Sequence, residues 1–317
     1  MKLKKELWTI LIAALLIAML VGCHKQTEEF TEGIELTDPE MVEVKAGTFE
    51  MGNTRDDKMS GTDEKPVHEV ELTYDYEIGK YEVTNKEFLA FLNGASVPAD
   101  GILNGNKLMR TDDASAFKYE GCEYSLKSNR REDNPVIFVT WYGAIEYCNW
   151  LSEKEGLAKV YDSDGDLIHN ETKTNDITQV EGYRLLTEAE WEYAARGGHE
   201  STEDYKYAGS DDINEVAWYK GNDSEGIPQE VGKKKPNEIG IYDMSGNVSE
   251  WCHDNYGNYP SNKQTNPVEY QIPDTNRVCR GGNWDAASSW SRVASRDEYD
   301  PTTNGYSIGF RIAKTGE

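Results

Sequence analysis

"GYRLLTEAEWEYAARGG", residues 182–198, carries the strongest local structural signal in this chain. Thr187 is followed three residues later by Glu190, which is the capping-box pattern that marks the first turn of a helix. Gly197 favours the end of that helix, because glycine readily takes the left-handed conformation found at helix C-termini. The stretch therefore predicts a short helix that runs through Arg196.

Glu188 and Glu192 are four residues apart on this predicted helix, so their side chains share one face. Paired carboxylates can carry out acid–base chemistry. Glutamates are mostly exposed in proteins, and they also serve as helix caps. We therefore expect these two side chains to face solvent or to cap the backbone.

The residues toward the N-terminus predict strands and a second helix. "MVEVKAGTFEM" (41–51) alternates apolar and polar residues and breaks at Gly47, the pattern of two strands joined as a hairpin. Thr84 and Glu87 form a second capping box, and the apolar residues behind them fall on one helical face. We expect a hairpin followed by an amphipathic helix.

A third helix is expected where apolar residues recur at helical spacing from Trp141 to Leu151, with Thr140 as its N-cap. After Gly198 the chain consists mostly of short strands and turns, and the whole chain has eight Trp and 19 Tyr. These patterns predict one α+β domain over residues 41–317, with short strands and a few short helices.

The first 22 residues have the features of an export signal. Three lysines precede the apolar run 7–21, which is short for a membrane span. The run ends at Gly22-Cys23 and resembles the lipobox of bacterial lipoproteins, which implies cleavage before Cys23 and lipidation of its sulfur. An ordinary signal peptide with a chance cysteine, or a short N-terminal anchor, is the alternative. Residues 23–40 are polar and are expected to tether the lipid to the fold.

The chain is strongly acidic, with 58 Asp and Glu against 33 Lys and Arg and a formal net charge of −25 at pH 7. Loss of residues 1–22 would remove three lysines and one glutamate and leave it more acidic. Such a surface repels the phosphates of nucleic acids. We therefore expect no nucleic-acid partner.

Four cysteines follow Cys23, and an exported protein can join cysteines as disulfides. Their spacings do not match those of a zinc site. We expect Cys252 to pair with Cys279 and Cys148 to be buried and free. The pairing stays open, because four cysteines allow three connectivities.

Six segments, taken in order, closely resemble the formylglycine-generating enzyme family, also called the sulfatase-modifying factor family. The six segments are "VEVKAGTFEMGN" (42–53), "YEVTNKEF" (81–88), "NPVIFVTWYGAIEYCNWLS" (134–152), "GYRLLTEAEWEYAARGG" (182–198), "GIYDMSGNVSEWC" (240–252) and "RGGNW…SIGFRIA" (280–313). The resemblance spans roughly residues 41–314. It implies a large, irregular α+β fold related to C-type lectins.

A calcium site is expected in "DMSGNVSEW" (243–251). Its two carboxylates and its turn backbone offer the oxygen ligands that Ca²⁺ prefers, although a turn with solvated acids fits these residues equally well. The family binds structural calcium here. The resemblance implies that the side chains of Asp243 and Glu250 and the main-chain carbonyls of Gly246 and Val248 would hold the ion.

The reagents of the family's oxidation reaction are missing. The family uses two cysteines that bind copper(I), and soft thiolates suit that ion. In this chain the two positions fall on Ala286 and Ser291. We therefore expect no copper and assign no catalytic residue, and the sequence leaves open whether the chain is an enzyme.

Polar and aromatic residues dominate the segment 284–307, and such a composition is typical of binding loops. The same stretch is the ligand face in C-type-lectin-like variable proteins made by diversity-generating retroelements, to which this chain is loosely similar. Arg280, Arg292, Arg296 and Arg311 are expected to pin these loops to carbonyls and carboxylates. The expected ligand face comprises Trp284, Asp285, Ser289, Trp290, Asp297, Tyr299, Asp300 and Tyr306.

These observations favour a bacterial lipoprotein of the outer membrane whose domain acts as a non-catalytic binding or envelope-assembly module. Its partners would be the membrane, through the lipid, and a protein or glycan of the cell envelope. One alternative is an oxidase, either one that matures sulfatases or one with other ligands. A further alternative is a diversified C-type-lectin-like receptor.

Overall fold

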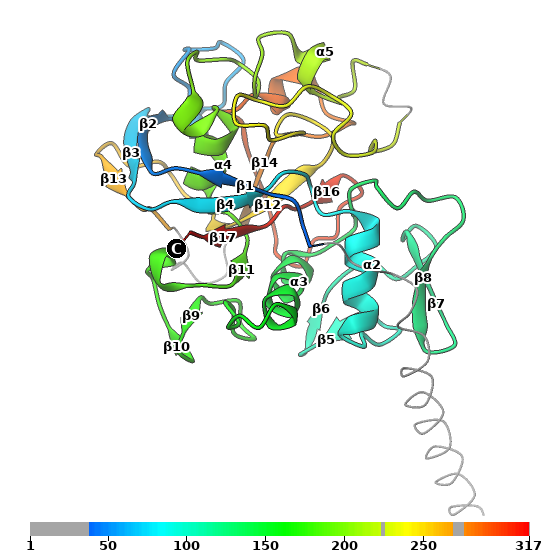
Figure 1. Cartoon of the computed structure of the whole chain (residues 1–317). Helices are drawn as coiled ribbons and strands as arrows, with labels where there is room; N and C mark the ends of the chain where they lie inside the picture. The colour runs from blue at the N-terminus through cyan, green and yellow to red at the C-terminus, as the bar shows by residue number, and fades with distance from the viewer. Residues whose placement is uncertain (1–37, 223–225, 269–275, 317) are drawn as a thin grey trace, which may run out of the picture.

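The computed structural model describes residues 38–222, 226–268 and 276–316. Many short strands and a few short helices make up this part of the chain, so the expected α+β class is confirmed (Figure 1). The expectations for the export signal, for Cys23 and for most of the tether concern residues 1–37, which lie outside the described residues.

Both expected capping boxes form. Thr84 caps its helix by accepting a hydrogen bond from the N–H of Glu87, and Thr187 does the same for Glu190. Thr140 is the N-cap of the third expected helix. The α-helices are α2 (Asn85–Gly94), α3 (Trp141–Lys154), α4 (Glu188–Ala195) and α5 (Ile213–Val216). Short 3-10 turns are η1 (Thr62–Glu64), η2 (Ile177–Gln179), η3 (Gly198–Glu200) and η4 (Ser288–Ser291).

Three sheets of more than two strands organise the domain. The first has the order β1 (Met41–Val44), β4 (Tyr76–Gly79), β17 (Ala313–Thr315) and β11 (Tyr183–Arg184), all antiparallel. The second has the order β15 (Arg296–Tyr299), β14 (Arg277–Arg280), β12 (Ser249–Asn255) and β16 (Ile308–Gly309), in which β12 and β16 are parallel. The third has the order β13 (Gln264–Thr265), β3 (His68–Leu72) and β2 (Gly47–Met51). Three small hairpins are β5–β6 (Ile102–Leu103, Asn106–Lys107), β7–β8 (Phe117–Glu120, Glu123–Leu126) and β9–β10 (Ile168–His169, Thr172–Lys173).

The hairpin expected over residues 41–51 is wrong. Two strands do form there, but β1 pairs with β4 and β2 pairs with β3. The two strands therefore enter different sheets, because each pairs with a strand further along the chain. Local alternation predicts a strand but not the strand that pairs with it.

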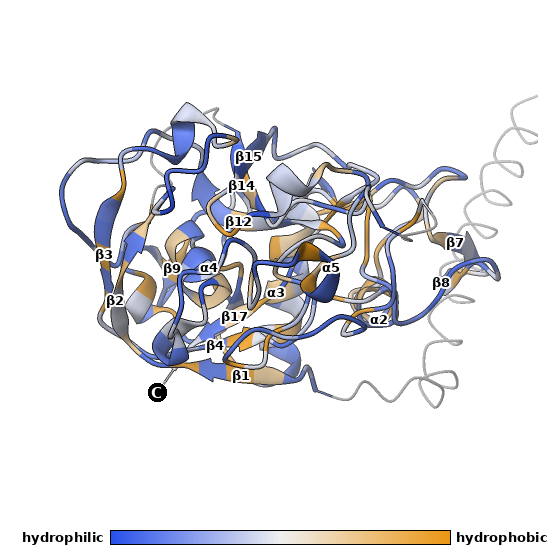
Figure 2. Ribbon diagram, turned by 90° about the horizontal axis from the view of Figure 1, so that it is seen from above, coloured by the Kyte–Doolittle hydropathy of each residue, from blue (hydrophilic) through white to orange (hydrophobic). Residues whose placement is uncertain are grey.

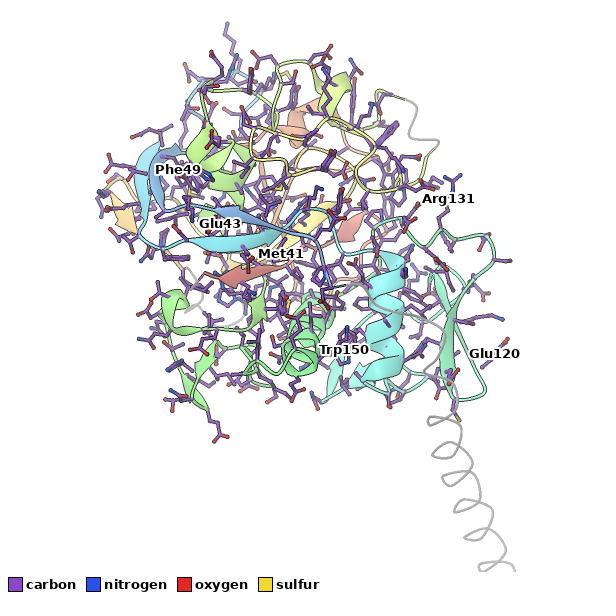
Figure 3. All side chains as sticks on the ribbon, in the orientation of Figure 1. Met41, Glu43, Phe49, Glu120, Arg131 and Trp150 are labelled. Atoms are coloured by element: carbon purple, nitrogen blue, oxygen red, sulfur yellow. The ribbon has the colours of Figure 1, made fainter. Side chains whose placement is uncertain are left out.

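Two large clusters of buried apolar side chains form most of the core of the described residues, and a small third cluster lies at α5. One large cluster lies around α2 and α3, and the other lies between α4 and the strands β2, β3 and β4. In Figure 1 these helices lie on opposite sides of β1 and β4. Figure 2 shows hydrophobic segments toward the centre and mostly hydrophilic outer loops. Figure 3 shows Trp150 of α3 next to α2, and its ring centroid is 5.7 Å from that of Phe91.

The expected disulfide between Cys252 and Cys279 does not form, and both cysteines are free and buried, as is Cys148. Cys279 of β14 lies opposite Trp251 in the register of β12. Neighbouring residues of a strand point to opposite faces of the sheet, so the side chain of Cys252 points to the face opposite Trp251 and Cys279. The two thiols accordingly belong to different core clusters.

Candidate functional site

The sheet formed by β15, β14 and β12 separates two environments. Trp251, Cys279 and Asp297 lie side by side across the three strands and share one face. Glu250, Arg280 and Arg296 are the next row and point to the opposite face. One face meets helix α4, and the other forms the floor of a cavity.

On the α4 face, the glutamates of the helix are buried, so the expectation that Glu188 and Glu192 face solvent is wrong. Glu188 accepts from Arg296 Nε at 2.6 Å and from Nη2 at 2.8 Å, and Glu192 pairs with Arg280. Burial alone would raise the pKa of Glu188, but the guanidinium groups of Arg296 and Arg280 outweigh burial and hold it below its usual value. These carboxylates are occupied by structural ion pairs and are not placed for acid–base chemistry.

Arg280, Arg292 and Arg296 pin the segment 284–307, whereas Arg311 donates to Gly79, Tyr242 and Glu250 outside that segment. Arg280 also donates to three backbone carbonyls of the segment 293–295. Arg292 makes a two-pronged pair with Glu64, at 2.7 and 2.6 Å. Arg311 makes another with Glu250. The loops on the other face are therefore held from beneath by buried ion pairs.

The cavity on that other face has a volume of about 340 Å³. Five of the eight residues expected on the ligand face line it, so the structure brings most of that set together. These five are Asp285, Trp290, Asp297, Tyr299 and Tyr306. Trp284 packs its ring against Tyr306, with centroids 5.7 Å apart, whereas Ser289 and Asp300 do not line the cavity.

Hydrogen bonds fix the polar groups of the cavity. Tyr306 donates its hydroxyl to Asp285 Oδ2 at 2.9 Å, and Lys220 Nζ lies 3.2 Å from the other oxygen. These two partners lower the pKa of Asp285, with the Tyr306 hydrogen bond as the larger cause. Tyr299 donates its hydroxyl to Asp297 Oδ2 at 2.7 Å. Both carboxylates are therefore oriented before any ligand arrives.

Sequence reasoning missed several cavity residues, because they come from strands distant in the chain. Ser249 of β12 lines the cavity and accepts a hydrogen bond from Asn283 at 3.1 Å. Cys279 lies in the wall although it precedes the family motif. Burial, and then Asp297 and Glu250, raise the pKa of this thiol well above its usual value. Cys279 is thus a protonated thiol at neutral pH, and the period-two alternation of β14 is the sequence signal that could have placed it.

The two positions of the family's copper-binding cysteines do not fit copper(I). Ala286 lines the cavity and has no donor atom. Ser291 is fully buried, and its hydroxyl has no hydrogen-bond partner among the described residues. A hydroxyl is a hard ligand, and copper(I) prefers soft sulfur.

The residues expected to hold calcium lie in a buried, acidic region. Asp243 accepts from the N–H of Gly232 at 2.7 Å through Oδ2, while Oδ1 is buried without a hydrogen-bond partner among the described residues. Burial, followed by unfavourable interactions with Asp243 and Glu250, raises the pKa of Glu82 well above its usual value. Burial is also the main cause that raises the pKa of Asp243 to about 6. Sequence reasoning missed Glu82.

These features fit a cation, because the buried carboxylates Glu82, Asp243 and Glu250 outnumber the guanidinium of Arg311 that faces them. Glu250 is the less available ligand, since both its oxygens bond Arg311 and one also accepts from the indole of Trp191. The described residues contain no group of three or more His, Cys, Asp or Glu side chains arranged around a metal. The expected site takes two of its four ligands from main-chain carbonyls, so that finding does not bear on it.

The comparisons with known proteins agree with this architecture. The model of the sulfatase-modifying factor enzyme 1-like domain matches residues 26–316. "Chaperone protein LppX" of Paenibacillus barcinonensis is 31% identical over 97% of this chain and 99% of its own length. "Formylglycine-generating enzyme" of Streptomyces coelicolor is 27% identical over 87% of this chain and 89% of its own length.

Two further matches extend the comparison. "Serine/threonine-protein kinase pkn1" of Chlamydia pneumoniae is 30% identical over 87% of this chain, which spans only 38% of the length of that relative. The solved structure of "Treponema denticola variable protein 1" has a TM-score of 0.66 and 28% identity, and the match covers 87% of this chain and 95% of that one.

Proposed function

The chain belongs to the family of sulfatase-modifying factor enzyme 1-like domains, and we propose that it acts as a non-catalytic binding or assembly module of the bacterial cell envelope. The cavity chemistry carries this proposal. Where the family places two copper-binding cysteines, this chain has Ala286 and Ser291, and the thiol that lines the cavity is protonated at neutral pH. A cavity is nevertheless present at this place, and oriented polar groups and aromatic rings line it.

The relative named as a chaperone supports a protein client. The alignment covers 99% of that relative and 97% of this chain. A chaperone binds a protein chain and needs no redox reagent. This agrees with a cavity that has polar and aromatic walls but no pair of thiolates. The client would contact the ligand face of residues 284–307.

The proposed location is the outer membrane, with the lipid on Cys23 as the anchor and residues 23–40 as the tether. The described residues hold no helix that is long and apolar enough to cross a membrane. A lipid anchor would hold such a body at the envelope without a spanning segment.

Calcium is proposed as a structural ion. Asp243 would hold it with its free buried oxygen, assisted by Glu250 and by the carbonyls of Gly246 and Val248. The ion would supply positive charge to a buried region with more carboxylates than guanidinium groups.

The test compares the full-length chain, purified in detergent, with the double variant Ala286→Cys/Ser291→Cys. Each is incubated with copper(I), oxygen, a reductant and a Cys-x-Pro-x-Arg peptide, the substrate motif of the family. Peptide mass and copper(I) affinity are both measured. We expect no formylglycine and no cavity-bound copper for the unmodified chain, and tight copper(I) binding for the double variant. Turnover by the unmodified chain would instead establish the oxidase alternative.

A second candidate function is a diversified receptor, and the match to a protein titled a variable protein favours it. The same ligand face would then vary between closely related strains. Sequencing the 3′ coding region from many sister isolates tests this idea. Variation confined to codons 284–307 would support it, and an invariant region would reject it.

A further inference from the structure

We propose that the cavity over β15, β14 and β12 binds an organic cation, namely the ammonium or guanidinium group of a basic side chain. This inference rests on the proposed binding function of the same face and specifies the ligand chemistry that the face accepts. It follows from the charge, the aromatic rings and the size of the cavity, and from the rigidity of its floor.

The charge of the cavity is negative. Asp285 and Asp297 line it, and Arg296 also lines it although its guanidinium points to the opposite face. The charge of Arg296 is already neutralised by its two-pronged pair with Glu188 on the opposite face. Lys220 pairs with Asp285 from an exposed position, where its contribution is weak. Asp297 accepts hydrogen bonds from the hydroxyl of Tyr299 and from the N–H of Glu298, and no cationic side chain pairs with it among the described residues.

Aromatic rings surround these carboxylates. Trp290 and Tyr306 are 48% and 51% exposed, and they are among the few large apolar side chains with such exposure in the described residues. Tyr299 adds a third ring to the lining. A cation attracted by a carboxylate is further stabilised over the face of a Trp or Tyr ring. Aromatic rings beside carboxylates therefore favour a cation over an anionic ligand.

The floor of the cavity is rigid. Asp297 belongs to β15, which pairs with β14 over four residues, and Trp290 lies in η4, whose backbone packs against Gly282. Gly282 has a φ of +67°, and a Cβ there would lie 2.7 Å from the carbonyl carbon of Trp290. Such preorganisation reduces the entropy that binding must overcome.

The volume of about 340 Å³ is at the lower end of the range of small-molecule sites. It suits one side chain or a short polyamine and is too small for a folded segment. A client that inserts a lysine or arginine would use the cavity as an anchoring pocket, while the surrounding loops contact its surface.

The experiment measures binding to the full-length chain by calorimetry and by the fluorescence change attributable to Trp290. The probes are N-acetyl-arginine amide, N-acetyl-lysine amide and N-acetyl-citrulline amide, which is the neutral analogue of arginine. Spermidine tests a free polyamine as the source of the cation, and methyl glucoside tests a neutral sugar. We expect the two charged amino-acid amides to bind at least about tenfold more tightly than citrulline amide, because a charge-assisted hydrogen bond is lost with the charge.

The variants locate the site. Asp297→Asn and Trp290→Ala should each weaken binding of the arginine amide by about tenfold or more. Asp300→Asn is the matched control, since Asp300 lies in the same segment outside the cavity and its contacts to Thr302 use an oxygen that asparagine retains. That variant should bind within about twofold of the unmodified chain.

Tighter binding of spermidine than of either amide would identify a free polyamine as the source of the cation and keep the proposal. Equal binding of citrulline and arginine amides, preferential binding of the sugar, or an unchanged affinity in Asp297→Asn would overturn it. These outcomes are independent of the copper and formylglycine assay. If the chain does not bind the cationic probes, the cation proposal is rejected but the non-catalytic function is not. If the chain makes formylglycine, the non-catalytic function is rejected.

Discussion

Arg311 and Glu250 form a fully buried, two-pronged ion pair, with Nε–Oε2 and Nη2–Oε1 distances of 2.7 Å each. Arg311 also donates to the backbone carbonyls of Gly79 and Tyr242, so it ties three distant segments together. Glu82 and Asp243 lie close enough to influence the same guanidinium. Arg311 is therefore the direct counter-charge of Glu250, and two further buried carboxylates lie near the same cation.

Arg311→Met should strongly destabilise the domain, by about 3–5 kcal/mol, because it leaves buried carboxylates without their counter-charge. Urea unfolding followed by tryptophan fluorescence measures the change. Lys314→Met is the control, since the pair of Lys314 with Glu77 is partly exposed and should cost less than about 1 kcal/mol. Equal effects of the two variants would contradict the structural role of Arg311.

Calcium should raise the thermal stability of the protein after treatment with a chelator. At a concentration of 100 times the dissociation constant, a bound ligand adds about 2.7 kcal/mol. Asp243→Ala should lose this gain, because it removes the buried oxygen that would bind the ion. Asp164→Asn, at a side chain that is 78% exposed, should keep it. Identical melting curves with calcium and with chelator would reject the ion.

Stability should fall on acidification through the titration of Glu188. The folded-state pKa lies below the usual 4.5, so the unfolded chain binds more protons between the two values. The stabilisation from Glu188 is therefore fully present above about pH 4.5 and is lost as the pH falls through the folded-state pKa.

Glu188→Gln tests this pH dependence. The variant should be less stable than the unmodified chain at pH 7, by about 3–5 kcal/mol, and the difference should shrink below pH 4. Urea midpoints measured from pH 3 to pH 7 give both quantities. Glu153→Gln, at an exposed surface pair, should show neither effect. A gap that stays constant with pH would mean that Glu188 does not titrate as described.

Gly282→Ala should destabilise the domain and displace Trp290. An alanine would be strained at a φ of +67°, and its methyl group would lie 2.7 Å from backbone atoms of Trp290. Such strain costs about 1–3 kcal/mol. Gly257→Ala is a matched control, because no atom lies within 4 Å of the added methyl group. Thermal melting and the emission of Trp290 would measure the two effects, and an unperturbed variant would contradict the close approach.

Cys23→Ser should release the protein from the membrane fraction of the producing cells and abolish incorporation of labelled palmitate. Lipid attachment requires the sulfur of this residue. Cell fractionation with immunodetection measures the change. Cys148→Ser should remain in the membrane fraction, since that cysteine is buried in the domain. Continued membrane association of Cys23→Ser would favour an uncleaved apolar anchor.

Local sequence patterns predicted the helices well. The capping boxes at Thr84 and Thr187 set helix starts through contacts within four residues, and both form. Strand existence was equally readable at 41–51, but the pairing was wrong, because it depends on β3 and β4 further along the chain. The buried state of Glu188 and Glu192 was missed because their arginine partners are about ninety residues or more away.

The fold class, the family and five residues of the cavity lining could be predicted from the amino-acid sequence, because they depend on ordered motifs and on residues close together in the chain. Which side chains share a surface depends on how distant strands pair. The register of β15, β14 and β12 sends Cys279 and Asp297 to the cavity and Arg280 and Arg296 to α4. A shift of one residue would exchange these two sets, and the pairing that fixes the register is a long-range interaction that no local pattern specifies.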